Sequence, residues 1–180
     1  MVGIFFSCKN DMNHINKVVI DDDTSQETMD TVVSLITDLG KSKVLLTAPK
    51  INKIYEPIPE THCPTGIKVV FYDTANVIQG TLTANRGIIM ETKNRIEVFN
   101  NVILHNAEEQ KTLYTEHLIW EQKRIKGKDS SYVKSDVPVR VTEPNNEYFA
   151  DDIFADEKLN YYKGSNPRAK ILVDSLQIKK

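Results

Sequence analysis

Cysteine and histidine have the most versatile side-chain chemistry in this 180-residue chain, but their number and spacing limit what they can do. Two cysteines, Cys8 and Cys63, are too few for a disulfide framework. Cys63 stands in a His-Cys-Pro sequence next to an expected turn, so we expect an unpaired thiol in a loop. Among the four histidines, His105 and His117 could approach each other across a hairpin. Two ligands without a third do not make a zinc site, so we expect neither a metal nor a cofactor.

Sequence signatures of catalysis are also missing. Gly40-Lys41-Ser42 matches the end of a phosphate-binding loop, but Leu35 stands where the first glycine should be. No Gly-x-Ser-x-Gly or His-Glu-x-x-His sequence occurs. We expect Glu108, Glu109 and Glu121 to be solvated charges in polar turns. These observations predict a protein that is not an enzyme.

The surroundings of Cys8 favour a different kind of chemistry. This cysteine ends a short apolar run, residues 1–7, whose last member is the small residue Ser7. The pattern resembles the end of a bacterial lipoprotein signal peptide, which implies cleavage before Cys8 and acylation of its thiol and new amine. The alternative is an incidental cysteine near the N-terminus. On the first interpretation, residues 1–8 are a truncated signal stub.

Composition and charge exclude two other classes. The formal net charge is only −2, which does not provide the clustered positive charge that nucleic-acid binding requires. The sequence contains no run of eighteen apolar residues, the minimum for a transmembrane helix. Hydrophobic residues make up 40% of the chain, which is sufficient for a globular domain of this length.

The distribution of polar and β-branched residues divides the chain into a tether and a single β domain. Residues 9–30 are polar and include three successive aspartates, so we expect a tether. A weak helix is the alternative there, because Ile15, Val18 and Val19 have helical spacing. Residues 31–178 form the expected β domain. Its predicted strands cover residues 31–37, 44–48, 67–72, 77–84, 95–100, 102–106, 112–120, 132–134, 137–142, 147–150, 159–163 and 169–173.

Two features of this domain favour an open structure built from repeated units. We expect Pro49 to end the second strand, and Pro57, Pro59 and Pro64 to prevent a regular strand before Gly66. Four similar segments recur at offsets of 36, 32 and 35 residues, namely 46–48, 82–84, 114–116 and 149–151. Each unit reads as strand, connection, strand, turn and strand, which predicts stacked units with an open strand at each end. Ordinary meander patterning is the alternative.

Alternation along the strands predicts which side chains share an inner face. Such a face serves equally well as an ordinary core or as an apolar groove, and the sequence does not separate the two. The candidate lining residues are Val69, Phe71, Leu82, Ala84, Ile96, Val98, Val102, Leu104, Leu118, Trp120, Val137, Val139 and Val141.

The ordered series of β segments resembles the LptC family of lipopolysaccharide-export proteins. Residues 36–49 resemble its opening hairpin, residues 66–73 resemble the strand that follows, and later segments resemble further rungs. These later segments are residues 82–85, 101–106 and 113–121. The resemblance extends over roughly residues 31–173, and the related OstA-like domains of LptA share the same rungs. It implies an all-β fold, a twisted, open β-jelly-roll of repeated antiparallel rungs behind an N-terminal tether.

The same resemblance implies a function, a location and partners. The function is the transfer of lipopolysaccharide, in the periplasm, by a protein anchored to the bacterial inner membrane through its N-terminal tether. The implied partners are the inner-membrane transporter subunits LptF and LptG and an LptA-like periplasmic protein. The C-terminal run Lys170, Ile171, Leu172 and Val173 would be the edge that meets this periplasmic protein. The alternative is a lipoprotein β domain that binds or scaffolds other proteins without transferring lipid.

Overall fold

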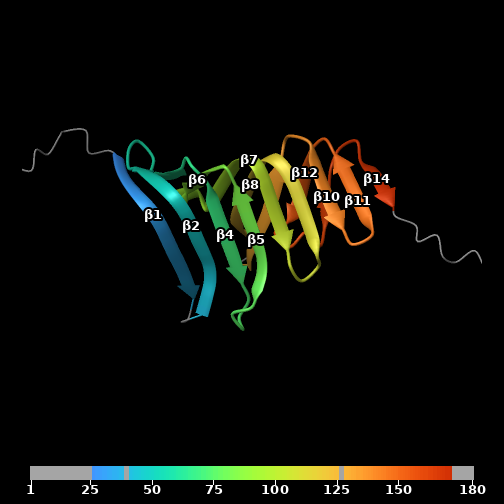
Figure 1. The fold of residues 1–180 in the computed structure, drawn as a ribbon, viewed down its shortest axis with the longest axis horizontal. Helices are drawn as coiled ribbons and strands as arrows, with labels where there is room; N and C mark the ends of the chain where they lie inside the picture. The colour runs from blue at the N-terminus through green and yellow to red at the C-terminus, as the bar shows by residue number, and fades with distance from the viewer. Residues whose placement is uncertain (1–25, 39–40, 126–127, 172–180) are drawn as a thin grey trace, which may run out of the picture.

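The computed structural model describes residues 26–38, 41–125 and 128–171, and these residues confirm the expected all-β fold. Fourteen strands form one large antiparallel sheet, consistent with a β-jelly-roll (Figure 1). The strands are β1 (Gln26–Asp38), β2 (Lys41–Ile54), β3 (Glu60–Cys63), β4 (Ile67–Tyr72), β5 (Ile78–Ala84), β6 (Arg86–Met90), β7 (Arg95–Asn106), β8 (Lys111–Ile125), β9 (Lys128–Ser135), β10 (Val139–Glu143), β11 (Asn146–Ala150), β12 (Ile153–Asp156), β13 (Tyr162–Lys163) and β14 (Arg168–Ile171). One 3₁₀ turn, Glu91–Lys93, joins β6 to β7.

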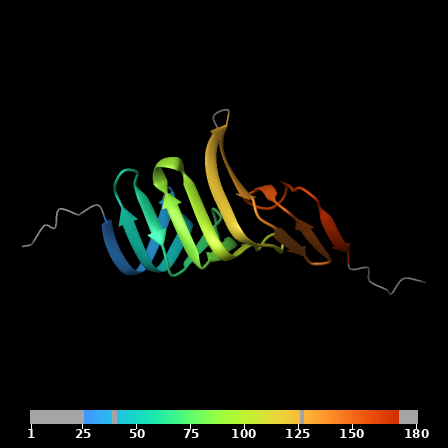
Figure 2. The ribbon, with the colours of Figure 1, turned by 90° about the horizontal axis from the view of Figure 1, so that it is seen from above.

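Long strands bend so that the sheet folds into two layers. Residues 103–106 of β7 pair with β5, whereas residues 95–99 pair with β6. In the same way β2 pairs first with β4 and then with β3, and β8 pairs with β10 and then with β9. The first layer contains β4, β5, β10, β11 and β14, and the second contains β3, β6, β9, β12 and β13. Seen from above, the strands follow one another along the long axis from β1 at one end to β14 at the other (Figure 2).

Asparagines produce the bend in the central pair of strands. Asn100 and Asn101 have φ angles of 63° and 51°, the left-handed region that asparagine tolerates better than most residues. The β7–β8 register shifts between Phe99 and Val102, and Glu116 of β8 accepts a hydrogen bond from the Asn101 N–H at 3.1 Å. The sequence predicts two strands here because the two asparagines interrupt the alternation. The structure instead forms a single bulged strand.

Pro49 marks the corresponding bend in β2, so the expectation that it ends the strand is wrong. The pairing of β1 with β2 passes over Thr31, which has a φ of 53°, and over Pro49 opposite it. Pairing with β4 ends at Thr47, and pairing with β3 begins at Asn52. Proline has no N–H to donate, and here it occupies the point where β2 changes partner and no ladder bond is needed.

Other boundaries also differ from the sequence prediction. β1 begins at Gln26, so residues 26–30, which the sequence assigns to the tether, belong to the first strand. β3 forms between Pro59 and Pro64 because none of its own four residues is a proline. β6 and β12 are strands that the sequence analysis missed. β4 has the predicted bounds.

The four similar segments of the sequence all lie where the chain passes from the first layer to the second. Residues 46–48 precede the bend at Pro49, and residues 82–84 end β5. Residues 114–116 reach the bend of β8, and residues 149–151 lead out of β11. One unit of the repeat therefore corresponds to one passage between the layers.

The two layers face each other through rows of apolar side chains. Partners across neighbouring strands of the first layer form the row Leu46, Val69, Leu82, Leu104, Leu113, Val141 and Tyr148. In the second layer the row is Ile89, Ile96, Trp120, Val133, Ala155 and Tyr162. All thirteen belong to one apolar cluster or pack against it, so the core is the space between the layers.

Candidate ligand groove

A hollow of about 600 Å³ interrupts this core in the N-terminal half of the roll. Phe71, Leu82 and Leu104 form its wall in the first layer. Leu118, Trp120 and Val133 form the opposite wall in the second layer. The volume falls in the range of about 300–1,000 Å³ that is typical of small-ligand sites. The structure therefore contains an apolar space, between its layers, of the size of a ligand site.

A glycine in the middle of the first layer contributes to this hollow. Gly80 pairs with Phe71 on one side and Asn106 on the other, and it adds no side chain to the inner face. A Cβ atom at this position would lie 2.6 Å from the carbonyl oxygen of His105, which is too close for any other residue without movement of the backbone. Gly80 is thus required by the close approach of β7.

Polar side chains surround the opening of the hollow. Gln79 and Glu108 lie on the side of the first layer, Gln122 and Ser131 on the side of the second, and Lys158 at one end. An apolar interior with a polar rim suits an amphipathic ligand whose apolar part enters while its polar part stays near water.

Trp120 adds one polar group to the wall of the hollow. Its indole N–H is buried and has no acceptor among the described residues. Buried donors normally have a partner, so this unpaired N–H is an exception.

The thirteen predicted lining residues divide into core and groove. Nine of them are buried, and Phe71, Ile96, Trp120 and Val137 are partly buried. All except Val137 belong to the apolar cluster between the layers or pack against it. Those that border the hollow are Phe71, Leu82, Leu104, Leu118 and Trp120.

Sequence reasoning missed three apolar residues at the hollow, Ile36, Val44 and Val133. Val133 pairs with Trp120 and faces the same side, but its predicted strand of three residues was too short to show alternation. Ile36 and Val44 pair with each other in the opening hairpin, where each also has an apolar neighbour, Leu35 and Leu45, so that no clear alternation appears.

A network of charged groups covers the outer face of the second layer. Glu121 accepts a hydrogen bond from the Tyr132 hydroxyl and pairs with Lys123 at 3.2 Å and Arg95 at 3.4 Å. The hydrogen bond from Tyr132, followed by the contacts with Lys123 and Lys134, holds the pKa of the Glu121 carboxyl below its usual value. Glu121 is therefore a buried strand residue, and its expected place in a solvated turn is wrong.

The two histidines expected across a hairpin have separate partners. His105 bonds to Thr112 at 3.0 Å. His117 lies between Asp136 at 2.7 Å and Glu97 at 2.9 Å, and its hydrogen bond lowers the pKa of the Asp136 carboxyl. In the described ranges, no group of three His, Cys, Asp or Glu side chains could hold a metal ion.

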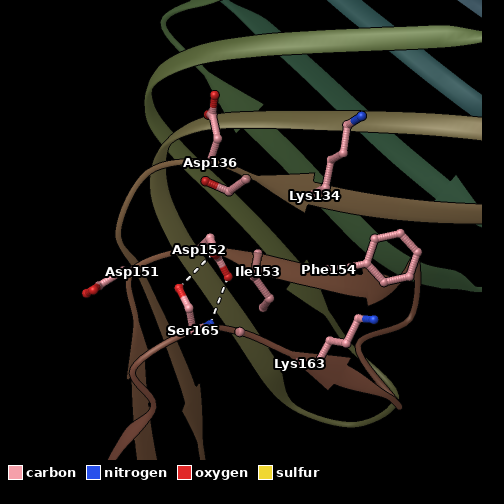
Figure 3. A pocket seen from close by; sticks show the side chains of 10 residues that line it. Lys134, Asp136, Asp151, Asp152, Ile153, Phe154, Lys163 and Ser165 are labelled. Carbon is pink, nitrogen blue, oxygen red and sulfur yellow. Dashed lines mark hydrogen bonds between the residues drawn. The ribbon is translucent and has the colours of Figure 1, made fainter.

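A second, more open hollow lies on the outside at the bend between the layers (Figure 3). Asp152 accepts bonds there from the backbone N–H and the hydroxyl of Ser165, at 2.8 and 2.7 Å, which lower the pKa of its carboxyl. A Cβ on Gly164 would lie 2.3 Å from the carbonyl oxygen of Asp152. The polar groups are used in joining two corners of the fold, so this hollow is structural.

Cys63 and the C-terminal strand complete the predicted sites. Cys63 is unpaired, as expected, but it is fully buried at the end of β3, so the expected loop position is wrong, and burial raises the pKa of its thiol to about 11. Lys170 and Ile171 lie in β14, whose one partner in the described ranges is β11. Cys8, Leu172 and Val173 lie outside the described residues.

An antiparallel roll with a ligand-sized apolar hollow between its layers places the chain among the open β-jelly-roll proteins. The family model of lipopolysaccharide-assembly, LptC-related proteins matches residues 1–160, and the chain belongs to this family. No curated protein matches the chain. The family is a periplasmic, inner-membrane-anchored component of lipopolysaccharide transport, and its partners are lipopolysaccharide and the Lpt complex. Within the described ranges, no helix has the length and apolar character needed to cross a membrane.

Proposed function

We propose that the hollow between the layers holds acyl chains of lipopolysaccharide while the sugar head remains outside. The single observation that carries this proposal is the apolar hollow with its polar rim. Transfer of a methylene from water is worth roughly 0.8 kcal/mol, so an acyl chain of a dozen carbons avoids water by about 10 kcal/mol. A carrier across an aqueous space must replace that water with apolar side chains. The interior needs no catalytic group for this task, so we propose that the protein is not an enzyme.

The two ends of the roll support a role as one link in a longer path. Within the part of the chain that the structure describes, β1 pairs with β2 alone, and its Val33, Leu35 and Ile36 are more than half exposed. Among the described residues β14 pairs with β11 alone, and all four residues of β14 are exposed. Unpaired strand edges can add a strand from another chain. We propose that lipid is accepted from the transporter subunits LptF and LptG, and that the β14 end, including Lys170 and Ile171, meets an LptA-like protein.

We further propose that acylated Cys8 anchors the chain to the inner membrane. One acyl chain gives only marginal membrane binding, so the multiply acylated cysteine of lipoproteins is the species required. The full chain with Cys8→Ala should then move from the membrane fraction to the soluble fraction. An unchanged distribution would remove Cys8 as the anchor and leave the groove proposal intact.

Photo-crosslinking in cells tests the groove itself. A photoreactive residue at Leu104, which faces the hollow, should capture lipopolysaccharide. The neighbouring Ile103 is the matched control because successive strand residues point to opposite faces. Equal labelling at the two positions would refute the groove. Capture of protein partners without lipid at either position would favour the alternative, a scaffolding domain.

A further inference from the structure

A short loop of the second layer reaches across the open side of the roll. Residues 157–161, here called the plug, join β12 to β13 and contact the hairpin between β7 and β8 in the first layer. The Asn106 side-chain amide donates to the Lys158 carbonyl, and the Lys111 ammonium donates to the Leu159 carbonyl at 3.3 Å. The two layers are thus joined at this point by bonds between one loop and one hairpin.

Asn106 is the centre of this connection. Its side chain is almost fully buried, and its carbonyl oxygen accepts the backbone N–H groups of Glu108 at 2.9 Å and Glu109 at 3.0 Å. The nitrogen of the same side-chain amide donates the hydrogen bond to the Lys158 carbonyl in the plug. Lys158 also approaches Glu108 at 3.9 Å, but both side chains are exposed, and such a pair contributes little.

Leu159 fixes the plug in the core with an uncommon backbone conformation. Its side chain is fully buried, although the residue lies in a loop. Its φ angle is 56°, a left-handed conformation that a leucine rarely adopts. Its N–H donates to the Asp156 carbonyl at 3.0 Å. The packing of the side chain therefore stabilises a loop conformation that the backbone alone does not favour.

The plug lies at the end of the hollow. Glu157 and Lys158 line one end of the hollow, and none of Leu159, Val141 and Tyr148 lines it. On the other side of the plug, Val141, Tyr148 and Tyr162 belong to the apolar cluster between the layers or pack against it. Tyr148 and Tyr162 there meet edge to face with ring centres 5.8 Å apart.

We propose that the plug is a displaceable end wall of the groove, which confines acyl chains to the N-terminal half until the contacts of Asn106 and Leu159 are released. This inference rests on the proposed lipid-binding function. The ligand is the apolar part of an amphipathic lipid, because the hollow that the plug closes has apolar walls and a polar rim. Movement of lipid toward the β14 end requires the plug to leave the core, and the bonds to Asn106 and Lys111 are few enough to break and re-form.

A pair of photoreactive probes on the two sides of the plug tests this inference. Benzoylphenylalanine replaces Phe71 or Tyr148 in the purified full chain, and purified lipopolysaccharide is the ligand. Both positions are aromatic, partly buried and packed against the same core, so the two substitutions are matched. In the otherwise unchanged protein we expect labelling at position 71 and only background at position 148.

Leu159→Gly opens the plug without forbidding its backbone conformation, because glycine adopts positive φ freely. Labelling at position 148 should then rise to the level seen at position 71. Leu113→Ala is the control, since it removes a fully buried leucine side chain from the same half of the roll without touching the loop. Circular dichroism confirms that each variant is folded.

Each outcome separates the plug from the groove. Absence of labelling at position 71 in the unchanged protein would refute the proposed function, and the plug with it. Equal labelling at positions 71 and 148 in the unchanged protein would refute the plug alone. The plug would also be overturned if Leu159→Gly left position 148 unlabelled, or if Leu113→Ala admitted lipid there to the same extent.

Hydrogen exchange provides a measurement that does not depend on lipid. Asn106→Ala should accelerate amide exchange at Leu159 and leave the exchange of β4 unchanged. The control is Asn166→Ala, which removes an exposed hydrogen bond to Asp151 at a distant corner. If Leu159 exchanged at the same rate in Asn106→Ala as in the unchanged protein, Asn106 would not hold the plug.

Discussion

Two leucines that face each other across β7 and β8 allow the hollow to be tested by stability alone. Leu104 and Leu113 are cross-strand partners on the inner face of the first layer, and their side chains are 5% and 0% exposed. Leu104 borders the hollow, whereas Leu113 does not and belongs to the buried apolar cluster. Both substitutions to alanine remove the same atoms, so the difference between them reports the surroundings.

The expected costs follow from these surroundings. Loss of three methylene equivalents lowers the free energy of unfolding by about 2.4 kcal/mol at either site. At Leu113 a new cavity adds to this cost, and such totals for a buried leucine reach about 5 kcal/mol. At Leu104 the removed atoms only enlarge an existing space, so the added cost is small. We expect Leu113→Ala to be the more destabilising variant by about 1–2 kcal/mol.

Urea unfolding followed by circular dichroism measures this difference, provided that the slope of the transition is the same for both variants. A shift of 1 kcal/mol corresponds to about 2–4 °C in Tm for a chain of this length, which thermal unfolding can resolve. Equal costs for the two variants, or a greater cost for Leu104→Ala, would show that the space beside Leu104 is filled in solution. The reasoning that makes it a ligand site would then be refuted.

Three further predictions concern single side chains. Because folding lowers the pKa of Glu121, its ionised form stabilises the fold above the unfolded-state pKa of about 4.3, and this contribution disappears as the pH falls through the lower folded-state pKa. In urea titrations between pH 5 and pH 2, Glu121→Gln should therefore lose less stability than the unchanged protein. The same loss of stability in both proteins would contradict this. Gly80→Ala should lower Tm more than Gly87→Ala, because the new Cβ would meet a backbone oxygen at 2.6 Å in the first case and a movable side chain at 3.1 Å in the second. A larger fall in Tm for Gly87→Ala would be inconsistent with the close approach at Gly80. Iodoacetamide at pH 8 should leave the buried Cys63 thiol unmodified in the folded protein and should modify it after denaturation, as measured by mass spectrometry of the peptide that contains it. Rapid modification of Cys63 in the folded protein would show that β3 opens.

Local patterns in the sequence predict most of the strands, and the failures have physical causes. The bounds of β4 follow from alternation between Gly66 and a turn at Asp73, where the Asn76 N–H bonds back to the Asp73 carbonyl at 3.2 Å. β6 was missed because its five residues include a glycine and follow directly on β5. The continuation of β2 through Pro49 could not be predicted. A proline is tolerated within a strand only where no ladder hydrogen bond is needed, and the sequence alone does not show with which strands the neighbouring residues pair.

The inner face of the roll was predictable in part. Period-two alternation identified inner-face residues such as Leu82, Leu104 and Trp120, because a strand sends alternate side chains to opposite faces. Alternation does not show where the side chains of the two facing layers leave a space between them. That depends on Gly80, which has no side chain, and on Leu159, which enters the core from a loop without any periodic signal.

Because few strands belong to both layers, the order in which parts of the molecule unfold can be predicted. Stacked units with contacts mainly to their neighbours tend to unfold in sections, and the terminal units are the least stable. β14 has four exposed residues and one neighbouring strand among the described residues, so it should open first. β7 and β8 are paired along almost their whole length and connect the layers at the centre, so they should be the last section to lose protection. Mechanical or chemical stress at one end would then unfold the terminal strands one after another, while the strands in the middle of the roll remain paired.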